Sequence, residues 1–150
     1  MKRLLITVLT ALVALSATAT VPHKARIPDI PGYQTLKGDF HIHTNFSDAH
    51  VWPETRADEA DFDGLDFIAI TDHVETHHQH MIKDYKADVN RNTSYELAAK
   101  AAKKYGIIVI HGAELTRGAR SFPGHFNTHF ISDGDSINEA AVAHEGKYGT

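Results

Sequence analysis

The spacing of apolar residues changes along the chain between the short repeat of a strand and the longer repeat of a helix. Residues 39–44 (DFHIHT) alternate apolar and polar side chains, as a short strand does. Residues 65–71 (LDFIAIT) are almost continuously apolar, which predicts a strand buried on both faces. Residues 93–105 instead repeat at helical spacing, and Gly106 can end that helix. The chain therefore alternates predicted strands with predicted helices.

These patterns set an order of elements for the chain. Strands are predicted at 39–44, 65–71, 107–110 and 125–131, and helices at 53–62, 93–105 and 137–144. Residues 77–92 and 116–124 are polar and are predicted to be loops. Apolar strands alternating with helices favour an α/β fold with a mainly parallel sheet, in which chemical groups collect at the carboxyl ends of the strands.

The helix starts carry local signals. Pro53 suits the first turn of the earliest helix, where a missing N–H costs nothing. Thr93 with Glu96, and Ser136 with Glu139, have the spacing of a capping box, in which a hydroxyl and a carboxylate satisfy the first free N–H groups. We therefore expect the two later helices to start at these residues.

Composition adds a broad class and one unusual feature. The chain has 150 residues, 42% of them hydrophobic and 23% charged, which is typical of one globular domain. It has no cysteine, which excludes disulfides, cysteine-ligated zinc and a thiol nucleophile. The net charge of -4 argues against a nucleic-acid-binding surface. The 12 histidines are the feature that needs an explanation.

The N-terminal residues form the pattern of an export signal. A positively charged start precedes an apolar run from Leu4 to Ala17, and residues 17–19 (ATA) suit a cleavage site near Ala19. The run is shorter than the ~20 residues that span a bilayer, so we expect no membrane span. We expect an exported protein, periplasmic or secreted. The predicted division is a signal peptide at 1–19, an extended leader at 20–38 and a domain at 39–150.

Histidines and carboxylates gather at the ends of four predicted strands. His41 and His43 lie two residues apart, so both rings are expected on one face of the first strand. A single strand histidine is more often a hydrogen-bonded core residue, but four strand ends with such residues are hard to explain that way. Imidazole and carboxylate ligands suit Zn, Mn or Fe, and we expect a metal site. The candidates are His41, His43, Asp48, Asp72, His73, Glu114, His125 and His129.

Four segments together resemble the PHP (polymerase and histidinol phosphatase) domain. Residues 41–48 (HIHTNFSD) are similar to its first motif, H-x-H-T-x-x-S-D, and residues 71–73 (TDH) to its second. Residues 112–116 (GAELT) and 123–127 (PGHFN) are similar to the next two, in the same order. The leader sequence PDIPGY resembles a secreted subgroup of the family.

The resemblance implies a distorted (β/α)7 TIM-like barrel with a metal cluster, usually of three ions, that hydrolyses phosphate esters. Carried over by motif, His41 and His43 would bind the first ion and His125 the second. Glu114 would bridge these two ions, which its two carboxylate oxygens allow. The substrate would be a small phosphorylated molecule.

The remaining roles follow from the same motifs. Asp48 and His73 would bind a third ion, and Asp72 would orient a ligand. Arg117 could clamp a phosphate as a planar fork, or be an ordinary solvated loop residue. Glu114 and Arg117 are the expected catalytic residues. The ions could be Zn, Mn or Fe, two or three in a full domain.

The family pattern extends beyond this sequence. Two later segments, a strand ending in an N-H-P-like motif and a segment near the C-terminus of the domain with an aspartate and a histidine two residues apart, do not follow the fourth motif in this sequence. We expect about the first half of the barrel, which alone would bind metal weakly and have little activity. A non-catalytic metal-binding module and a hydrolase of a non-phosphate bond are the alternatives. The oligomeric state is left open.

Overall fold

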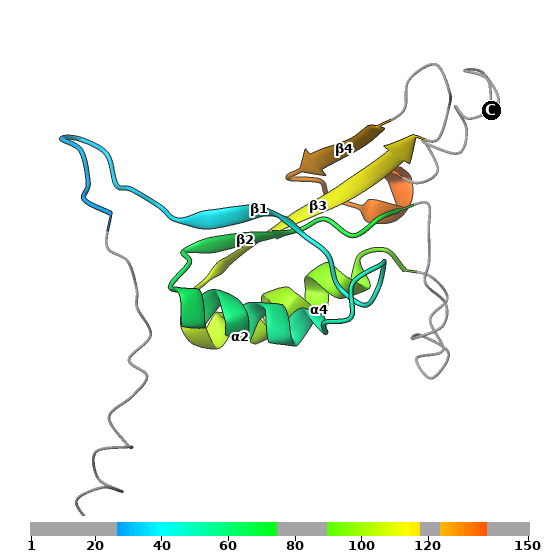
Figure 1. Ribbon diagram of the computed structural model, residues 1–150, viewed down its shortest axis with the longest axis horizontal. Helices are drawn as coiled ribbons and strands as arrows, with labels where there is room; N and C mark the ends of the chain where they lie inside the picture. Colours follow the sequence, from blue (N-terminus) through cyan, green and yellow to red (C-terminus); the bar gives the residue numbers. More distant parts are fainter. Residues whose placement is uncertain (1–26, 75–89, 118–123, 138–150) are drawn as a thin grey trace, which may run out of the picture.

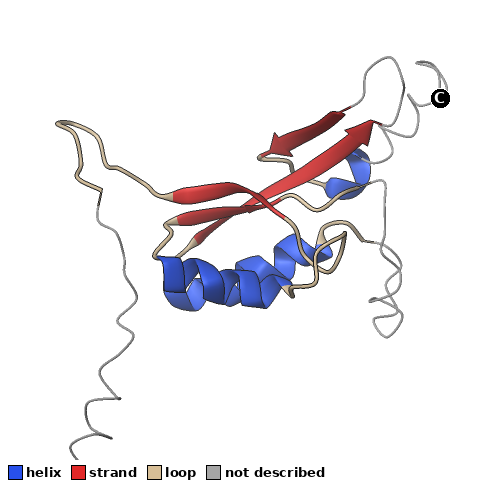
Figure 2. Cartoon of the chain, viewed as in Figure 1, coloured by secondary structure: helices blue, strands red, loops and turns tan. Residues whose placement is uncertain are grey.

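Helices and strands of this α/β chain form two layers, a curled sheet and a pair of helices against one of its faces (Figures 1 and 2). The structure, a computed structural model, describes residues 27–74, 90–117 and 124–137. The predicted signal peptide, most of loop 77–92 and most of the last predicted helix lie outside the described residues. The strands are β1 (Gly38–Ile42), β2 (Phe67–Ile70), β3 (Ile108–Arg117) and β4 (Gly124–His129), and the helices are α2 (Pro53–Asp63), α4 (Thr93–Ala102) and the 3₁₀ turn η1 (Lys103–Tyr105).

The strands follow one another across the sheet in the order β1-β2-β3-β4. β1 pairs with β2 and β2 with β3 in parallel, as predicted, but β4 runs antiparallel to β3. Only residues 118–123 separate β3 from β4, whereas a parallel crossover needs about a dozen residues or more. The result is the half-barrel sheet of a partial TIM-like barrel, which confirms the predicted fold class.

The core lies between the sheet and the two helices. Ile68 and Ile70 of β2 are 0% and 1% exposed and pack against Ala60 of α2 and Ala98 of α4. Small alanine side chains at these positions allow the helices to approach the sheet closely. The prediction of a buried second strand is confirmed, and Ile42 of β1 packs against the edge of the same cluster.

β3 is longer than predicted. The apolar run 107–110 suggested a short strand, but β3 continues to Arg117 because residues 112–117 pair with β4. The predicted loop at 116–124 is therefore wrong at both ends, where Arg117 and Gly124 belong to strands. A segment of mixed polarity continues this strand because the antiparallel partner satisfies its backbone groups, a condition that apolar periodicity does not report.

The predicted capping box at Thr93 is wrong. Thr93 is the first helical residue of α4, and the N-cap position belongs to Asn92, whose side chain makes no capping bond. The Asn92 amide instead donates to Asp133 at 2.9 Å and accepts from the Gly134 N–H at 2.8 Å. A tertiary contact thus takes the side chain that could have capped the helix.

The last helix begins earlier than predicted. Residues 134–137 are already helical, so Ser136 lies inside the helix and Asp133 precedes it. Asp133 accepts from the N–H of Asp135 at 3.1 Å and from the Ser136 hydroxyl at 2.6 Å. These bonds lower the pKa of Asp133 to about 2, the Ser136 hydroxyl contributing most.

Residues 27–37 are the described part of the predicted leader. They are largely exposed and turn where the Tyr33 N–H donates to the Ile30 carbonyl at 2.9 Å. The Lys37 N–H donates to the Asp66 carboxylate at 2.7 Å, which ties the end of this segment to the start of β2. Among the described residues, no helix is long and apolar enough to cross a membrane.

Candidate metal centre

The face of the sheet opposite the helices carries the candidate site. Ile42 packs toward the helices, so the neighbouring side chains of His41 and His43 lie on the other face. Glu114 of β3 is held beside the end of β2, because its N–H donates to the Asp72 carbonyl at 3.1 Å and its carbonyl accepts from the Val74 N–H at 3.2 Å. Parallel pairing thus brings residues more than 70 positions apart into one cluster.

Glu114 lies at the centre of this cluster. Its Oε2 is 2.7 Å from Nε2 of His41 and 2.7 Å from Nε2 of His43, and its Oε1 is 2.5 Å from Nδ1 of His125. The side chain is only 3% exposed. Burial alone would raise the pKa of Glu114, but the surrounding histidines, His41 foremost, outweigh burial and hold the pKa below its usual value. The carboxylate is therefore ionised and faces imidazoles on both sides.

The donor atoms have the spacing of ligands around a small cation. Nε2 of His41 and Nε2 of His43 are 2.9 Å apart, and each is 2.7 Å from the same Glu114 oxygen. Two ring nitrogens at that distance repel unless a proton or a cation lies between them. Bonds of about 2.0–2.2 Å to one ion would place its ligands roughly 3 Å from one another, so this set fits a divalent metal.

His43 has its second nitrogen held as well. Nδ1 of His43 is 2.7 Å from Oδ1 of Asp48, whose other oxygen lies 3.5 Å from Nε2 of His73. Burial alone would raise the pKa of Asp48. The contacts with His43 and His73 outweigh burial and hold the pKa below its usual value. An ionised Asp48 keeps the proton on Nδ1 of His43, which leaves Nε2 free to bind a metal.

The antiparallel direction of β4 places His125 in the cluster. His125 pairs with residue 116 of β3, which lies two residues after Glu114. The side chains of His125 and Glu114 therefore lie on the same face of the sheet. The ring of His125 lies 5.6 Å from that of His73, centroid to centroid. His129, four residues further along β4, is carried away from the centre and stands edge-on to Phe40.

The six predicted metal ligands therefore lie together, whereas Asp72 and His129 belong to none of the groups that they form. Three overlapping groups could each hold an ion. Asp72 lies behind them, bonded to Thr44 and Ser47. Arg117 ends β3, but its side chain is outside the described part of the chain. The groups are His41–His43–Glu114, His43–Asp48–His73 and His73–Glu114–His125.

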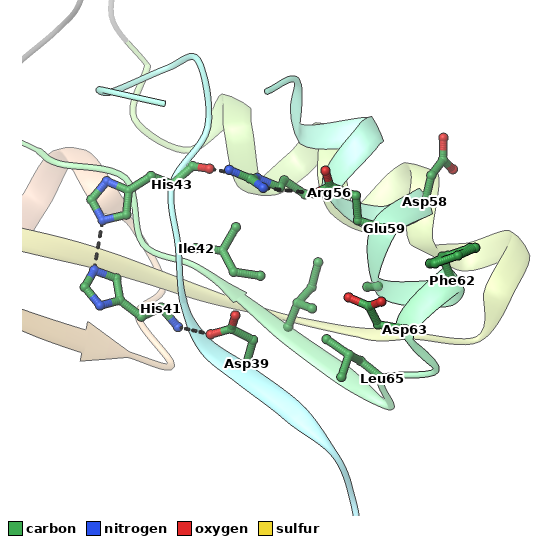
Figure 3. Close-up of a pocket in the computed structure, with 12 residues that line it drawn as sticks. Asp39, His41, Ile42, His43, Arg56, Asp58, Glu59, Phe62, Asp63 and Leu65 are labelled. Atoms are coloured by element: carbon green, nitrogen blue, oxygen red, sulfur yellow. Dashed lines mark hydrogen bonds and ion pairs between the residues drawn. The ribbon is translucent and has the colours of Figure 1, made fainter. Parts of the chain in front are cut away.

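Arg56 of α2 is a residue near the site that the sequence reasoning missed. Its Nε donates to the main-chain carbonyl of His43 at 3.0 Å, and its Nη1 contacts Glu59 at 2.9 Å (Figure 3). Arg56 also lines a pocket beside β1, together with His41 and Asp39. A charged residue in the first turns of a surface helix is usually solvated. No pattern in the neighbouring sequence distinguishes Arg56 from such a residue.

Comparison with known proteins identifies the family. The sequence model of the PHP domain matches residues 39–141. This chain belongs to the PHP domain family. No protein of curated function matches it.

Solved structures agree with that family. A two-domain protein from Bacteroides vulgatus containing a predicted PHP-like metal-dependent phosphoesterase is 42% identical, with a TM-score of 0.69, over 87% of this chain and 37% of its own. A metal-dependent phosphoesterase candidate from Bifidobacterium adolescentis is 22% identical, TM-score 0.52, over 74% of this chain and 35% of its own. An amidohydrolase from Chromobacterium violaceum is 21% identical, TM-score 0.51, over 71% of this chain and 31% of its own. This PHP chain thus spans about a third of the length of each of these three structures.

Proposed function

We propose that the complete protein is a metal-dependent hydrolase of phosphate esters. The observation that carries the proposal is the position of Glu114, whose two oxygens face different histidines. A carboxylate so placed can hold two ions side by side, which suits in-line displacement at phosphorus. The description of the 42% identical B. vulgatus protein as a predicted metal-dependent phosphoesterase supports this reaction class.

The described residues divide into ligand sets for up to three ions. His41, His43 and Oε2 of Glu114 would hold the first ion, and Oε1 of Glu114 with His125 would hold the second. Asp48 and His73 would hold a third, because a neutral His43 has only one lone pair and uses it on the first. We expect the remaining ligands in the later segments that the family pattern implies. The mixture of imidazole and carboxylate suits Zn, Mn or Fe.

Divalent ions, when bound, supply Lewis acidity, which polarises a phosphoryl oxygen and lowers the pKa of water. The chain itself orients these groups. Asp48 holds the tautomer of His43, and the charge of Glu114 offsets the positive charge gathered beside it. We propose that Arg117, at the end of β3, clamps a phosphate oxygen of the substrate with its planar guanidinium. We propose a small phosphorylated substrate and no nucleic acid, because a net charge of -4 does not provide the basic surface that nucleic-acid binding needs.

A metal-reconstitution assay on the complete protein tests the reaction class. The protein is stripped with a chelator, reloaded with Zn, Mn or Fe, and assayed with p-nitrophenyl phosphate and bis-p-nitrophenyl phosphate. We expect metal-dependent turnover that His41→Gln abolishes. His50→Gln is the matched control, since His50 is exposed and outside the three groups.

The same assay decides between the alternatives. Metal binding without turnover of any ester would favour a non-catalytic metal-binding module. Turnover of a p-nitrophenyl ester of a carboxylic acid, or of an anilide, with no phosphatase activity would favour hydrolysis of another bond. That second outcome is worth measuring because a protein named as an amidohydrolase shares this fold.

We also propose that the protein is exported. The support is the positively charged start and the apolar run from Leu4 to Ala17, which together form a signal peptide pattern. Residues 1–38 fused to a reporter that is active only outside the cytoplasm should give a signal. Replacing Leu5 and Val8 by Arg should abolish it, and a reporter signal that survives this change would contradict export.

A further inference from the structure

A buried carboxylate joins the two chain segments that carry three of the candidate ligands. Oδ1 of Asp72 accepts from the Thr44 N–H and from the Ser47 hydroxyl, each at 2.6 Å, and Oδ2 accepts from the Thr44 hydroxyl at 2.7 Å. Thr44 and Ser47 are 0% exposed and Asp72 is 9% exposed. All three donors thus meet one carboxylate away from water, and the Ser47 hydroxyl also lies 3.3 Å from Nδ1 of His43 and 3.3 Å from Oδ1 of Asp48.

Each member of this trio, the Asp72 clamp (Thr44, Ser47 and Asp72), is next in sequence to a candidate ligand. Thr44 follows His43, Ser47 precedes Asp48, and Asp72 precedes His73. The clamp therefore holds together the end of β1, the loop after it and the end of β2. A shift at any of its bonds would move one ligand relative to the other two.

The loop between these ligands is also closed on Thr44. The Thr44 carbonyl accepts from the N–H groups of Ser47 at 3.1 Å and Ala49 at 3.2 Å, and its hydroxyl accepts from the Phe46 N–H at 3.1 Å. Because this turn is tied at Thr44 and Thr44 is tied to Asp72, the position of Asp48 is set by the clamp. Asp48 itself is 48% exposed and has little packing of its own.

We propose that the Asp72 clamp is a positioning device that sets the ion affinity of the Asp48–His73 group. This inference rests on the proposed metal-dependent function. Thr44, Ser47 and Asp72 touch no ion in it and act through the ligands beside them. Outer contacts of this kind typically change metal affinity by about 10- to 100-fold.

A purely structural role would have a different signature. A bond that only stabilises the fold lowers the melting temperature of the metal-free protein and weakens all ions alike. A positioning bond weakens one ion selectively at equal stability. Thr71 provides the comparison, since it is also 0% exposed and its hydroxyl bonds the Ile42 backbone between β1 and β2.

The test is a cobalt titration of the complete protein and three variants, Thr44→Val, Ser47→Ala and the control Thr71→Val. Visible Co²⁺ absorption reports the number and geometry of bound ions, and thermal unfolding of the metal-free protein reports stability. We expect Thr44→Val and Ser47→Ala to weaken one ion by about 10- to 100-fold and to change its absorption. Thr71→Val should lower the melting temperature comparably and leave all ions bound as in the wild type.

Each outcome decides the matter. Equal cobalt affinity in wild type and clamp variants overturns the clamp alone, as does uniform weakening of every ion. A wild type that binds no cobalt overturns the proposed function as well. Should Thr44→Val not fold, Ser47→Ala carries the test, with Thr44→Ser expected to restore the wild-type spectrum.

Discussion

Replacing Glu114 by Gln perturbs the centre of the candidate site with almost no change of shape. The carboxylate has two equivalent oxygens, and both are used: Oε2 faces His41 and His43, and Oε1 faces His125. A glutamine keeps one oxygen and places an NH2 group in the other position. One side of the side chain would then present a donor where a metal requires a lone pair.

The size of the effect follows from these contacts. The side chain is 3% exposed, so water cannot replace the lost oxygen. Losing one charge-assisted contact in such a setting costs about 1.5–3 kcal/mol, which corresponds to a roughly 10- to 100-fold weaker ion. The negative charge of Glu114 attracts both neighbouring ions, including the ion whose oxygen ligand a glutamine would keep. We therefore expect the affinity for both ions to fall. The bound metal should fall by at least one ion per chain.

Metal content by elemental analysis and competition with a coloured chelator measure this loss directly. Glu96→Gln is the control, because Glu96 is an exposed glutamate on α4 and makes the same change of charge. If Glu114→Gln retained the metal content of the wild type with affinities within about threefold, Glu114 would not bridge two ions. The division of the ligands into sets around it would then be wrong.

Three further outcomes are expected. Asp133→Asn should destabilise the protein above about pH 4, and the difference should vanish toward pH 2 in thermal unfolding, because the pKa of Asp133 is lowered from 3.8 to about 2 on folding. Gly112→Ala should cost about 1–3 kcal/mol in denaturant unfolding, since its Cβ would lie 2.8 Å from the Thr128 carbonyl oxygen; wild-type stability in that variant would contradict the packing of β3 on β4. The 150-residue chain alone should bind Mn or Zn weakly and show little p-nitrophenyl phosphate turnover, and a normal rate would show that these ligands suffice.

The six metal candidates could be found from the sequence because their positions depend on few tertiary details. His41, His43, His73 and Glu114 each lie in or next to a strand with apolar neighbours, and parallel strands bring their carboxyl ends to one edge. The motif spacing then separates these histidines from others such as His50. Their roles as ligands remain a proposal, but their proximity is a property of the fold.

What the sequence could not supply is information that belongs to contacts between distant segments. Thr93 and Glu96 match a capping box locally, yet the N-cap position belongs to Asn92, whose side chain is engaged by Asp133, some 40 residues later. The extension of β3 to Arg117 depends on its pairing with β4. Arg56 contacts the backbone of His43, and a backbone acceptor leaves no trace in side-chain patterns.

The position of His125 depends on a condition that its motif does not state, the direction of its strand. The fourth motif predicts that His125 is a metal ligand, but the start of a parallel strand would lie at the opposite edge from Glu114. Only the antiparallel direction of β4 brings its first residues beside the ends of β1 and β2, and the short connection after Arg117 enforces that direction. The same reversal removes His129, which lies four residues or about 13 Å further along the strand. The direction of one strand therefore decides which of two similar histidines can share Glu114.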